Sequence, residues 1–295
     1  MGSFATALAD RTVLLDGGLA TRLEARGHDL SDTLWSARLL LADPGEIRAT
    51  HEDFFAAGAE VATTASYQVS ESGFEAAGYT AAEARQALRR SVRLAREASE
   101  AFGGPRWVAA SVGPYGATLA DGSEYRGDYG LSVDELRAWH RPRLEILAEA
   151  GADVLACETI PSLAETEALA AELTALGVPA WLSLTTVGDR TRRDEPASEA
   201  FAIAAEVPNV VALGANCCDP GEAAAVVTAV GGRRPVIFYP NSGEDWDARA
   251  RHWTGRAAVG DSARSWADAG VRALGGCCRV TPDQIAGMRT ELDRR

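Results

Sequence analysis

Four of the five cysteines form two adjacent pairs, Cys217-Cys218 and Cys277-Cys278. Each pair follows a short apolar run of the kind that forms a buried strand. Adjacent cysteines rarely bond to each other, because the resulting ring is strained. The first residues lack the charged and then apolar pattern of a secretory signal, so we expect reduced thiols and a cytoplasmic protein. Thiolates gathered at two strand ends point to a soft metal ion.

Zinc suits such a group of thiolates, and a zinc site with three protein ligands keeps a fourth position open for chemistry. A purely structural zinc would close that position with a fourth ligand such as Cys218. A dithiol redox site is a further alternative, but its cysteines are usually spaced C-x-x-C, and no such spacing occurs here. The fifth cysteine, Cys157, lies inside an apolar run and is expected to be a core residue.

Two carboxylates, Asp16 and Glu158, end the first and the fourth apolar runs, where a simple surface acid would have no reason to lie. Carboxylates in such positions are suited to binding an ammonium group. Asp16 has an alternative role as the cap of a following helix. We therefore expect the two acids to recognise a charged amine on a substrate.

A long loop at residues 113–129 mixes tyrosines with acids. Long loops in compact domains often form a lid or a binding wall. Aromatic faces next to carboxylates suit a weakly hydrated cation, such as a sulfonium or a quaternary ammonium. The loop is thus a candidate wall for a cationic ligand.

The composition narrows the class of partner. The formal net charge is −13, and no segment concentrates basic residues, which argues against nucleic acid and against an anionic membrane surface. No apolar run is long enough to span a bilayer. All basic side chains other than histidine are arginine, so chemistry that needs a lysine amine, such as Schiff-base or pyridoxal phosphate chemistry, is excluded. We expect small-molecule substrates.

Short apolar runs alternate with longer segments of helical period, which is typical of repeated βα units on a parallel sheet. Eight such units without a linker predict one α/β domain over residues 1–295, a (β/α)8 TIM barrel. A doubly wound open sheet is the alternative, but the Gly-rich fingerprint of its dinucleotide-binding members is missing. The expected strands are 13–15, 60–65, 107–111, 154–157, 180–185, 210–213, 236–239 and 271–274. The expected helices are 32–42, 45–57, 81–102, 133–150, 162–176, 197–206, 220–230, 261–269 and 282–293.

The barrel explains how distant cysteines could meet. Reactive groups of such barrels project from the C-terminal ends of the strands, and side chains of alternate strands share layers. The two cysteine pairs follow the sixth and the eighth expected strands. Their thiols can therefore converge across the end of the seventh strand.

Several of these stretches together resemble the zinc-dependent homocysteine S-methyltransferases, in particular the branch that uses S-methylmethionine or S-adenosylmethionine. The resemblance covers nearly the whole chain, and its two cysteine motifs are specific. One departure is Thr33, which stands where the family's D-P-L-W-S-A element has proline. The matching stretches are LDGGLAT (15–21), LWSARLL (34–40), TTASYQ (63–68), LADGSEYRGDY (119–129), GANC (214–217), YPNSGE (239–244) and GGCCR (275–279).

The resemblance implies residue roles and a reaction. It implies that Cys217, Cys277 and Cys278 bind Zn²⁺, which leaves Cys218 as an extra cysteine. It also implies that homocysteine attacks the methyl group of the sulfonium donor as a zinc-bound thiolate, giving methionine. Asp16 and Glu158 are expected to bind the amino group of homocysteine. The remaining expected substrate contacts are Thr64, Trp35 and Tyr125, of which the last two are expected to serve the donor.

Two alternatives remain at this point. A betaine-dependent homocysteine methyltransferase would also take a methyl group from a positive centre. A non-catalytic thiol-binding or metal-binding barrel would use the same cysteines without turnover. Cobalamin-dependent or folate-dependent methionine synthases use a related barrel but need further cofactor domains, for which 295 residues leave no room.

Overall fold

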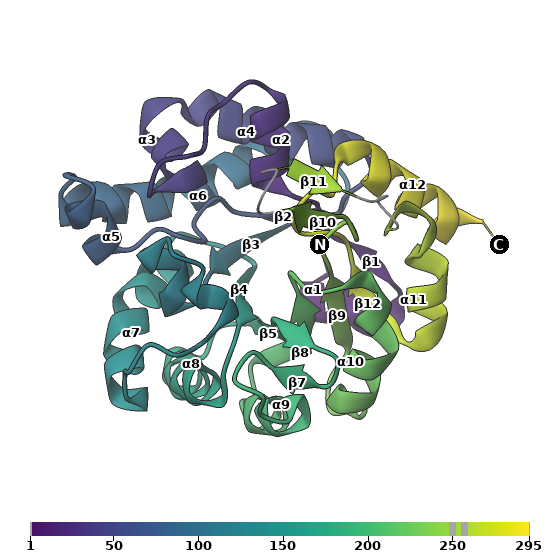
Figure 1. The fold of residues 1–295 in the computed structure, drawn as a ribbon. Coiled ribbons are helices and arrows are strands. Elements are labelled where there is room, and N and C mark those ends of the chain that lie inside the picture. Colours follow the sequence, from purple (N-terminus) through teal and green to yellow (C-terminus); the bar gives the residue numbers. More distant parts are fainter. Residues whose placement is uncertain (1, 248–251, 255–258, 295) are drawn as a thin grey trace.

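The computed structural model describes residues 2–247, 252–254 and 259–294. Eight parallel strands form one sheet in the order β1-β12-β9-β8-β5-β4-β3-β2, and a bridge between Leu15 and Val61 joins its two ends. This arrangement is a (β/α)8 barrel (Figure 1), so the predicted fold is confirmed. All eight predicted strands are present: β1 (Val13–Leu14), β2 (Val61–Thr63), β3 (Trp107–Val112), β4 (Val154–Ile160), β5 (Ala180–Leu184), β8 (Val210–Asn216), β9 (Val236–Tyr239) and β12 (Val271–Leu274).

The helices between the strands lie outside the barrel (Figure 1). Local signals in the sequence start several of them: Thr80, Ser132 and Thr281 each form a capping box with the residue three positions later. Eight of the nine predicted helices are found with ends shifted by at most two residues. They are α4 (Pro44–Ala56), α6 (Ala81–Phe102), α7 (Val133–Glu149), α8 (Leu163–Leu176), α9 (Ala197–Ala205), η4 with α10 (Pro220–Val230), α11 (Ala263–Ala269) and α12 (Pro282–Asp293).

The predicted helix over 32–42 is instead a 3-10 turn, η1 (Trp35–Arg38), followed by the short α3 (Leu39–Ala42). Trp35 has a φ of 50°, which a continuous right-handed helix does not allow. Several short elements were not predicted: α1 (Phe4–Asp10), α2 (Leu19–Ala25), α5 (Glu71–Ala76), and two hairpins, β6 (Thr186–Val187) with β7 (Arg190–Thr191) and β10 (Asp245–Asp247) with β11 (His252–Thr254).

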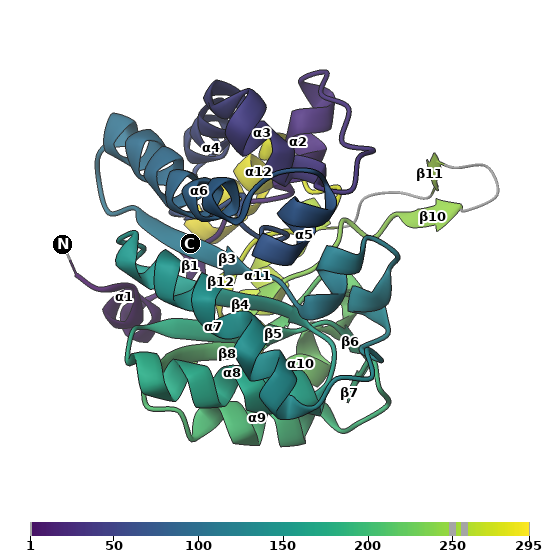
Figure 2. The same cartoon turned by 90° about the vertical axis from the view of Figure 1, so that its left-hand side faces the viewer.

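The N-terminal helix α1 lies at one end of the barrel, and the two hairpins lie at the other (Figure 2). Phe4 and Leu8 of α1 are buried in the apolar cluster inside the barrel. The ring of Phe4 lies 5.8 Å from that of Trp107 and 5.6 Å from that of Trp181, centroid to centroid. This contact closes the N-terminal end of the barrel, so that its cavity opens at the C-terminal ends of the strands, where barrel enzymes carry their active sites.

A second, larger apolar cluster fills the space between the strands and the surrounding helices. Cys157 belongs to it and is completely buried, as predicted for a core residue. Within the described part of the chain, no helix combines the length and the apolar character needed to cross a membrane.

Candidate metal and substrate site

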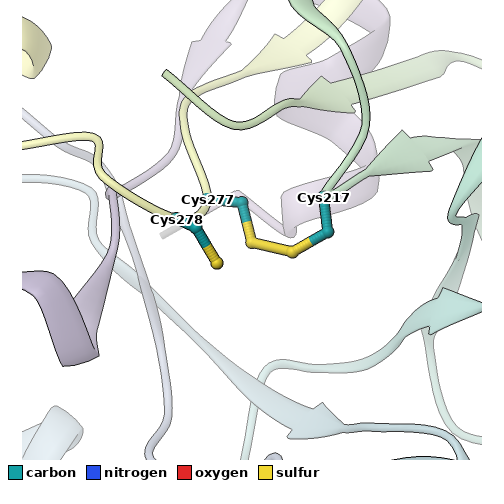
Figure 3. A group of neighbouring side chains, drawn as sticks. All are labelled: Cys217, Cys277 and Cys278. Carbon is teal, nitrogen blue, oxygen red and sulfur yellow. A yellow bond between two sulfur atoms is a disulfide. The ribbon is translucent and has the colours of Figure 1, made fainter. Parts of the chain in front are cut away.

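Three thiols meet at the C-terminal end of the barrel. Cys217 follows β8, and Cys277 and Cys278 follow β12. Their sulfur atoms all lie within 4.8 Å of one another, and they form the one group of three or more potential metal ligands found among the described residues. The two corners converge across the end of β9, as the strand order predicted (Figure 3).

The sulfur atoms of Cys217 and Cys277 are bonded to each other, while Cys278 is free and partly exposed (Figure 3). The sequence predicted thiolates at all three positions, so this bond differs from the expectation. Two thiols held this close can either share a metal ion or be oxidised to a disulfide. In this structure, Cys217 and Cys277 form the disulfide. The bond does not join adjacent cysteines, in agreement with the strain argument.

The backbone around the thiols is fixed by the loop that follows β9. The Asn241 side-chain oxygen accepts a hydrogen bond from the N–H of Cys278, and the backbone N–H of Asn241 donates to the carbonyl of Cys218. The N–H of Cys277 donates to the carbonyl of Pro240 at 2.7 Å. This loop therefore ties the two cysteine corners together.

Glycines allow the close backbone packing behind Cys277. A Cβ atom on Gly276 would lie 2.2 Å from a methyl carbon of Val280, and a Cβ atom on Gly18 would lie 2.6 Å from the carbonyl oxygen of Cys277. The Gly276 N–H also donates to the carbonyl of Asp16. These contacts hold the cysteine corner directly against the turn that carries Asp16.

Asp16 lies at the end of β1 and is buried. Its two carboxylate oxygens accept hydrogen bonds from the backbone N–H and the hydroxyl of Thr63, at 2.7 and 2.8 Å. Burial nevertheless raises the pKa of Asp16 to about 7, and the charge of Glu158 adds to the effect. Because it bonds Thr63 on the next strand, Asp16 does not cap the helix that follows it.

Glu158 lies on β4 and is also buried. One oxygen accepts a hydrogen bond from the Ser111 hydroxyl, and the other accepts one from the Tyr239 hydroxyl at 2.9 Å. Burial raises the pKa of Glu158 to about 7. The two acids therefore share one cavity, and among the described residues neither has a positively charged side chain as a hydrogen-bonding partner.

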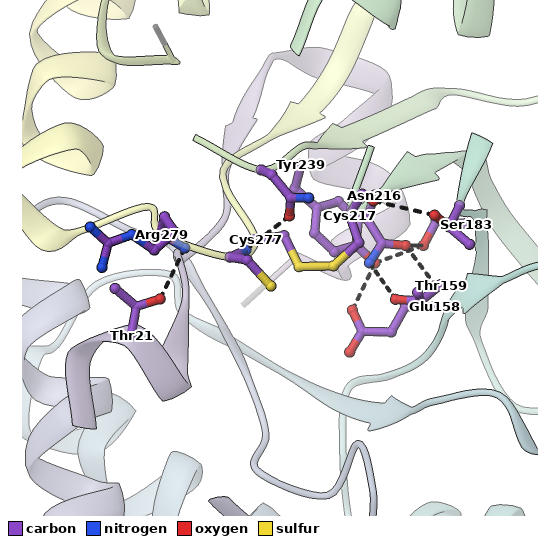
Figure 4. Close-up of a disulfide and its surroundings, with 12 residues drawn as sticks. Thr21, Glu158, Thr159, Ser183, Asn216, Cys217, Tyr239, Cys277 and Arg279 are labelled. Atoms are coloured by element: carbon purple, nitrogen blue, oxygen red, sulfur yellow. Dashed lines mark hydrogen bonds between the residues drawn. A yellow bond between two sulfur atoms is a disulfide. The ribbon is translucent and has the colours of Figure 1, made fainter. Parts of the chain in front are cut away.

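A hydrogen-bond network behind Glu158 crosses four strands. The Tyr239 hydroxyl also bonds the Trp181 indole N–H at 3.0 Å and the Ser183 hydroxyl at 2.7 Å. Ser183 in turn donates to the side chain of Asn216, the residue before Cys217 (Figure 4). The network thus connects the acid on β4 to the first cysteine corner.

A cavity of about 460 Å³ joins the thiols to the acids. One wall is aromatic: the rings of Trp35 and Tyr67 meet edge to face at 6.3 Å. Tyr125 from η3 (Ser123–Tyr125) completes the wall, and Arg192 lies 5.5 Å from the centroid of its ring. All eight residues predicted for the site line this cavity: Asp16, Glu158, Thr64, Trp35, Tyr125, Cys217, Cys277 and Cys278.

The hydroxyl of Thr64 is already engaged, because it bonds the Ser66 hydroxyl at 2.7 Å and accepts from the Ser111 N–H at 3.0 Å. Sequence reasoning did not identify Ser111, Tyr239 or Asn216 as site residues. Each lies on a strand, and the position at the strand end was the signal that could have found them. Cys218 is buried outside the group of three sulfurs, and burial raises the pKa of its thiol.

A model of the homocysteine S-methyltransferase family matches residues 13–292 of the chain. The homocysteine S-methyltransferase of Escherichia coli (strain K12) is 47% identical over 291 residues, which cover 94% of each chain. The chain therefore belongs to the homocysteine S-methyltransferase family. Its activity is the methylation of homocysteine, a small-molecule substrate.

Two solved structures of the homocysteine methyltransferase MmuM from Escherichia coli agree with this fold. The metallated form has a TM-score of 0.87 at 44% identity, and the oxidized form has a TM-score of 0.87 at 45% identity. Both alignments cover 97% of this chain and 98% of the other. That relative thus exists with a metal and in an oxidised state, and the thiol cluster of the present chain has ligands that could hold a metal.

Proposed function

We propose that the protein transfers a methyl group from a sulfonium donor, S-methylmethionine or S-adenosylmethionine, to homocysteine, with zinc as its metal. The observation that supports this is the placement of three sulfurs, mutually within 4.8 Å, in the same cavity as two buried acids. Tetrahedral zinc with Zn–S distances of about 2.3 Å would place the sulfurs about 3.8 Å apart, so the reduced cluster needs only small movements to fit.

Cys217, Cys277 and Cys278 would hold the ion, with the fourth position facing the cavity. A free thiol has a pKa near 8.5 and is mostly protonated at neutral pH. A zinc ion held by these cysteines would favour the thiolate form of the homocysteine sulfur, so no side chain would have to act as a general base. The role of the protein is then to place that sulfur opposite the methyl group of the donor.

Asp16 and Glu158 would bind the ammonium group of homocysteine. Both carboxylates have unused lone pairs on oxygens that already accept one hydrogen bond each. An ammonium placed between them would favour their ionised forms and so lower the pKa of both groups from about 7. The substrate would thus supply the positive charge that the protein does not.

The aromatic wall would receive the donor. A sulfonium centre cannot donate an N–H hydrogen bond, so the faces of Trp35 and Tyr125 suit it better than a polar group would. Thr64 would support the acceptor side indirectly, because its hydroxyl holds the backbone of Ser111, which donates to Glu158.

The first experiment measures zinc content and homocysteine methylation under reducing conditions. We expect about one zinc per chain, lost together with activity in Cys277→Ser and largely kept in the matched control Cys218→Ser. A Cys218→Ser variant that loses its zinc while Cys277→Ser keeps it would contradict the ligand assignment. A purified protein that binds zinc and homocysteine but transfers no methyl group from any donor would instead be a binding protein.

The second experiment compares S-methylmethionine, S-adenosylmethionine and betaine as donors at matched concentrations. We expect the two sulfonium donors to be faster. Betaine reacting faster than both would overturn the donor assignment while leaving the thiol site unaffected.

A further inference from the structure

The loop that carries Tyr125 contains three acids, which differ in their ion pairs. Asp121 accepts from the N–H of Ser123 at 2.9 Å and pairs with Arg126 at 3.2 Å. Asp128 pairs with Arg193 at 3.1 Å. Glu124, on η3, forms no ion pair of this kind within the described ranges.

Glu124 lines the cavity, and its Oε2 atom is shielded from solvent without a hydrogen-bond partner. A buried acceptor without a partner destabilises the folded protein, and more so when it is charged. Burial accordingly raises the pKa of Glu124. Glu124 directly precedes Tyr125 on η3, and both residues line the cavity, so Glu124 lies next to the aromatic wall.

Resting on the proposed function, we propose that Glu124 binds the α-ammonium group of an amino-acid sulfonium donor and thereby selects donors that carry an amino group. The ammonium has N–H groups that can satisfy the unpartnered oxygen, whereas a sulfonium or a quaternary ammonium centre has none. A charge-assisted hydrogen bond of this kind also fixes the position of the donor relative to the thiol site.

The reaction itself favours the ammonium as the partner of Glu124. Methyl transfer to a thiolate removes the positive charge of the sulfonium, because the electron pair of the breaking C–S bond stays on the departing sulfur. A carboxylate on that centre would stabilise the ground state more than the transition state and slow transfer. The ammonium keeps its charge throughout, so binding it carries no such penalty.

Besides Asp16 and Glu158, two other acids line the cavity, Glu24 on α2 and Asp32. Asp32 pairs with Arg38, so Glu24 is the competing candidate. It is exposed, so an unpaired charge there costs little and requires no ligand. Asp128→Asn provides the matched control, because it removes one negative charge from the same loop at an exposed side chain that does not line the cavity.

The test is donor kinetics at saturating homocysteine for wild type, Glu124→Gln, Glu24→Gln and Asp128→Asn. The donors are S-methylmethionine and dimethylsulfonioacetate, which has a sulfonium and a carboxylate but no amino group. Binding of the second compound is read from turnover or from its inhibition constant against S-methylmethionine. Zinc content and the KM for homocysteine are measured for every variant.

For Glu124→Gln we expect the KM for S-methylmethionine to rise about 10- to 100-fold, with binding of the amino-free sulfonium, zinc content and the KM for homocysteine near those of wild type. The control should match wild type. The proposal would be overturned if Glu124→Gln weakened the binding of both sulfonium compounds equally, or of neither. It would also be overturned if Glu24→Gln, and not Glu124→Gln, raised the KM for S-methylmethionine. If the wild-type enzyme turned over neither S-methylmethionine nor S-adenosylmethionine, the proposed class of donor would be refuted. That result would contradict the proposed function and not only the role of Glu124.

Discussion

Replacing Asp16 with asparagine should change how the stability of the protein depends on pH. Burial raises the pKa of Asp16 from 3.8 to about 7, so the folded protein keeps a proton that the unfolded chain releases at lower pH. The carboxyl group therefore destabilises the folded state progressively as the pH rises from about 4 to about 7. At about 1.36 kcal/mol per pKa unit, its contribution between pH 5 and pH 8 is a loss of about 3 kcal/mol.

Urea denaturation of wild type and Asp16→Asn at the two pH values tests this number. Asparagine does not ionise, so the free energy of unfolding of the variant should fall less between pH 5 and pH 8, by about 2–3 kcal/mol. Both proteins contain Glu158 and the thiol cluster, whose own pH dependence cancels in the comparison to first order. An equal fall in both proteins would refute the claim that ionised Asp16 is costly in the free enzyme. The same variant should raise the KM for homocysteine about 10-fold or more, because the ammonium loses a charged partner.

Three further substitutions probe other parts of the site. Tyr239→Phe removes the hydrogen-bond partner of the Trp181 indole N–H and one of the two partners of Glu158, so thermal unfolding should show a loss of about 2–4 kcal/mol with zinc retained. Gly276→Ala places a Cβ atom 2.2 Å from a Val280 methyl carbon, and metal analysis should show zinc loss because the adjoining cysteine corner must move. Trp35→Leu should raise the KM for the sulfonium donor several-fold in steady-state assays and leave the KM for homocysteine unchanged. A homocysteine KM that rises with the donor KM would contradict the assignment of Trp35 to the donor.

The barrel could be predicted because its strands are short apolar runs and its helices begin at recognisable caps. Thr80 and Thr281 begin their helices through hydrogen bonds to the residue three positions later. Such local contacts can be predicted from the sequence alone. The turn at Trp35 could not be predicted in the same way. Its positive φ depends on how η1 packs at the cavity, which is a tertiary effect on a residue whose local preference allows a helix.

The candidate site was predictable to the extent that its residues stand at strand ends. Cys217 and Cys277 could be brought together from the strand order, since parallel strands end on one side of the barrel. The hydrogen bonds of Glu158 could not be predicted, because a strand-end position gives Ser111 and Tyr239 no partner until the register places their hydroxyls beside the acid. The disulfide between Cys217 and Cys277 was also not predicted, because the sequence indicates that the two cysteines are close but not their oxidation state.

The two sides of the cavity suit two different cations, an ammonium group and a sulfonium group. On the side of Asp16 and Glu158, buried oxygens that already accept hydrogen bonds can accept more, which suits an ammonium with three N–H groups. On the side of Trp35 and Tyr125, aromatic faces offer a weak attraction without hydrogen bonds, which suits a cation whose charge disappears during the reaction. Under the proposed function, strong binding would lie where the charge of the substrate persists and weak binding where it is lost. The transfer of a methyl group from a cation to a thiolate requires that division, because attraction to the reacting sulfonium would otherwise raise the barrier.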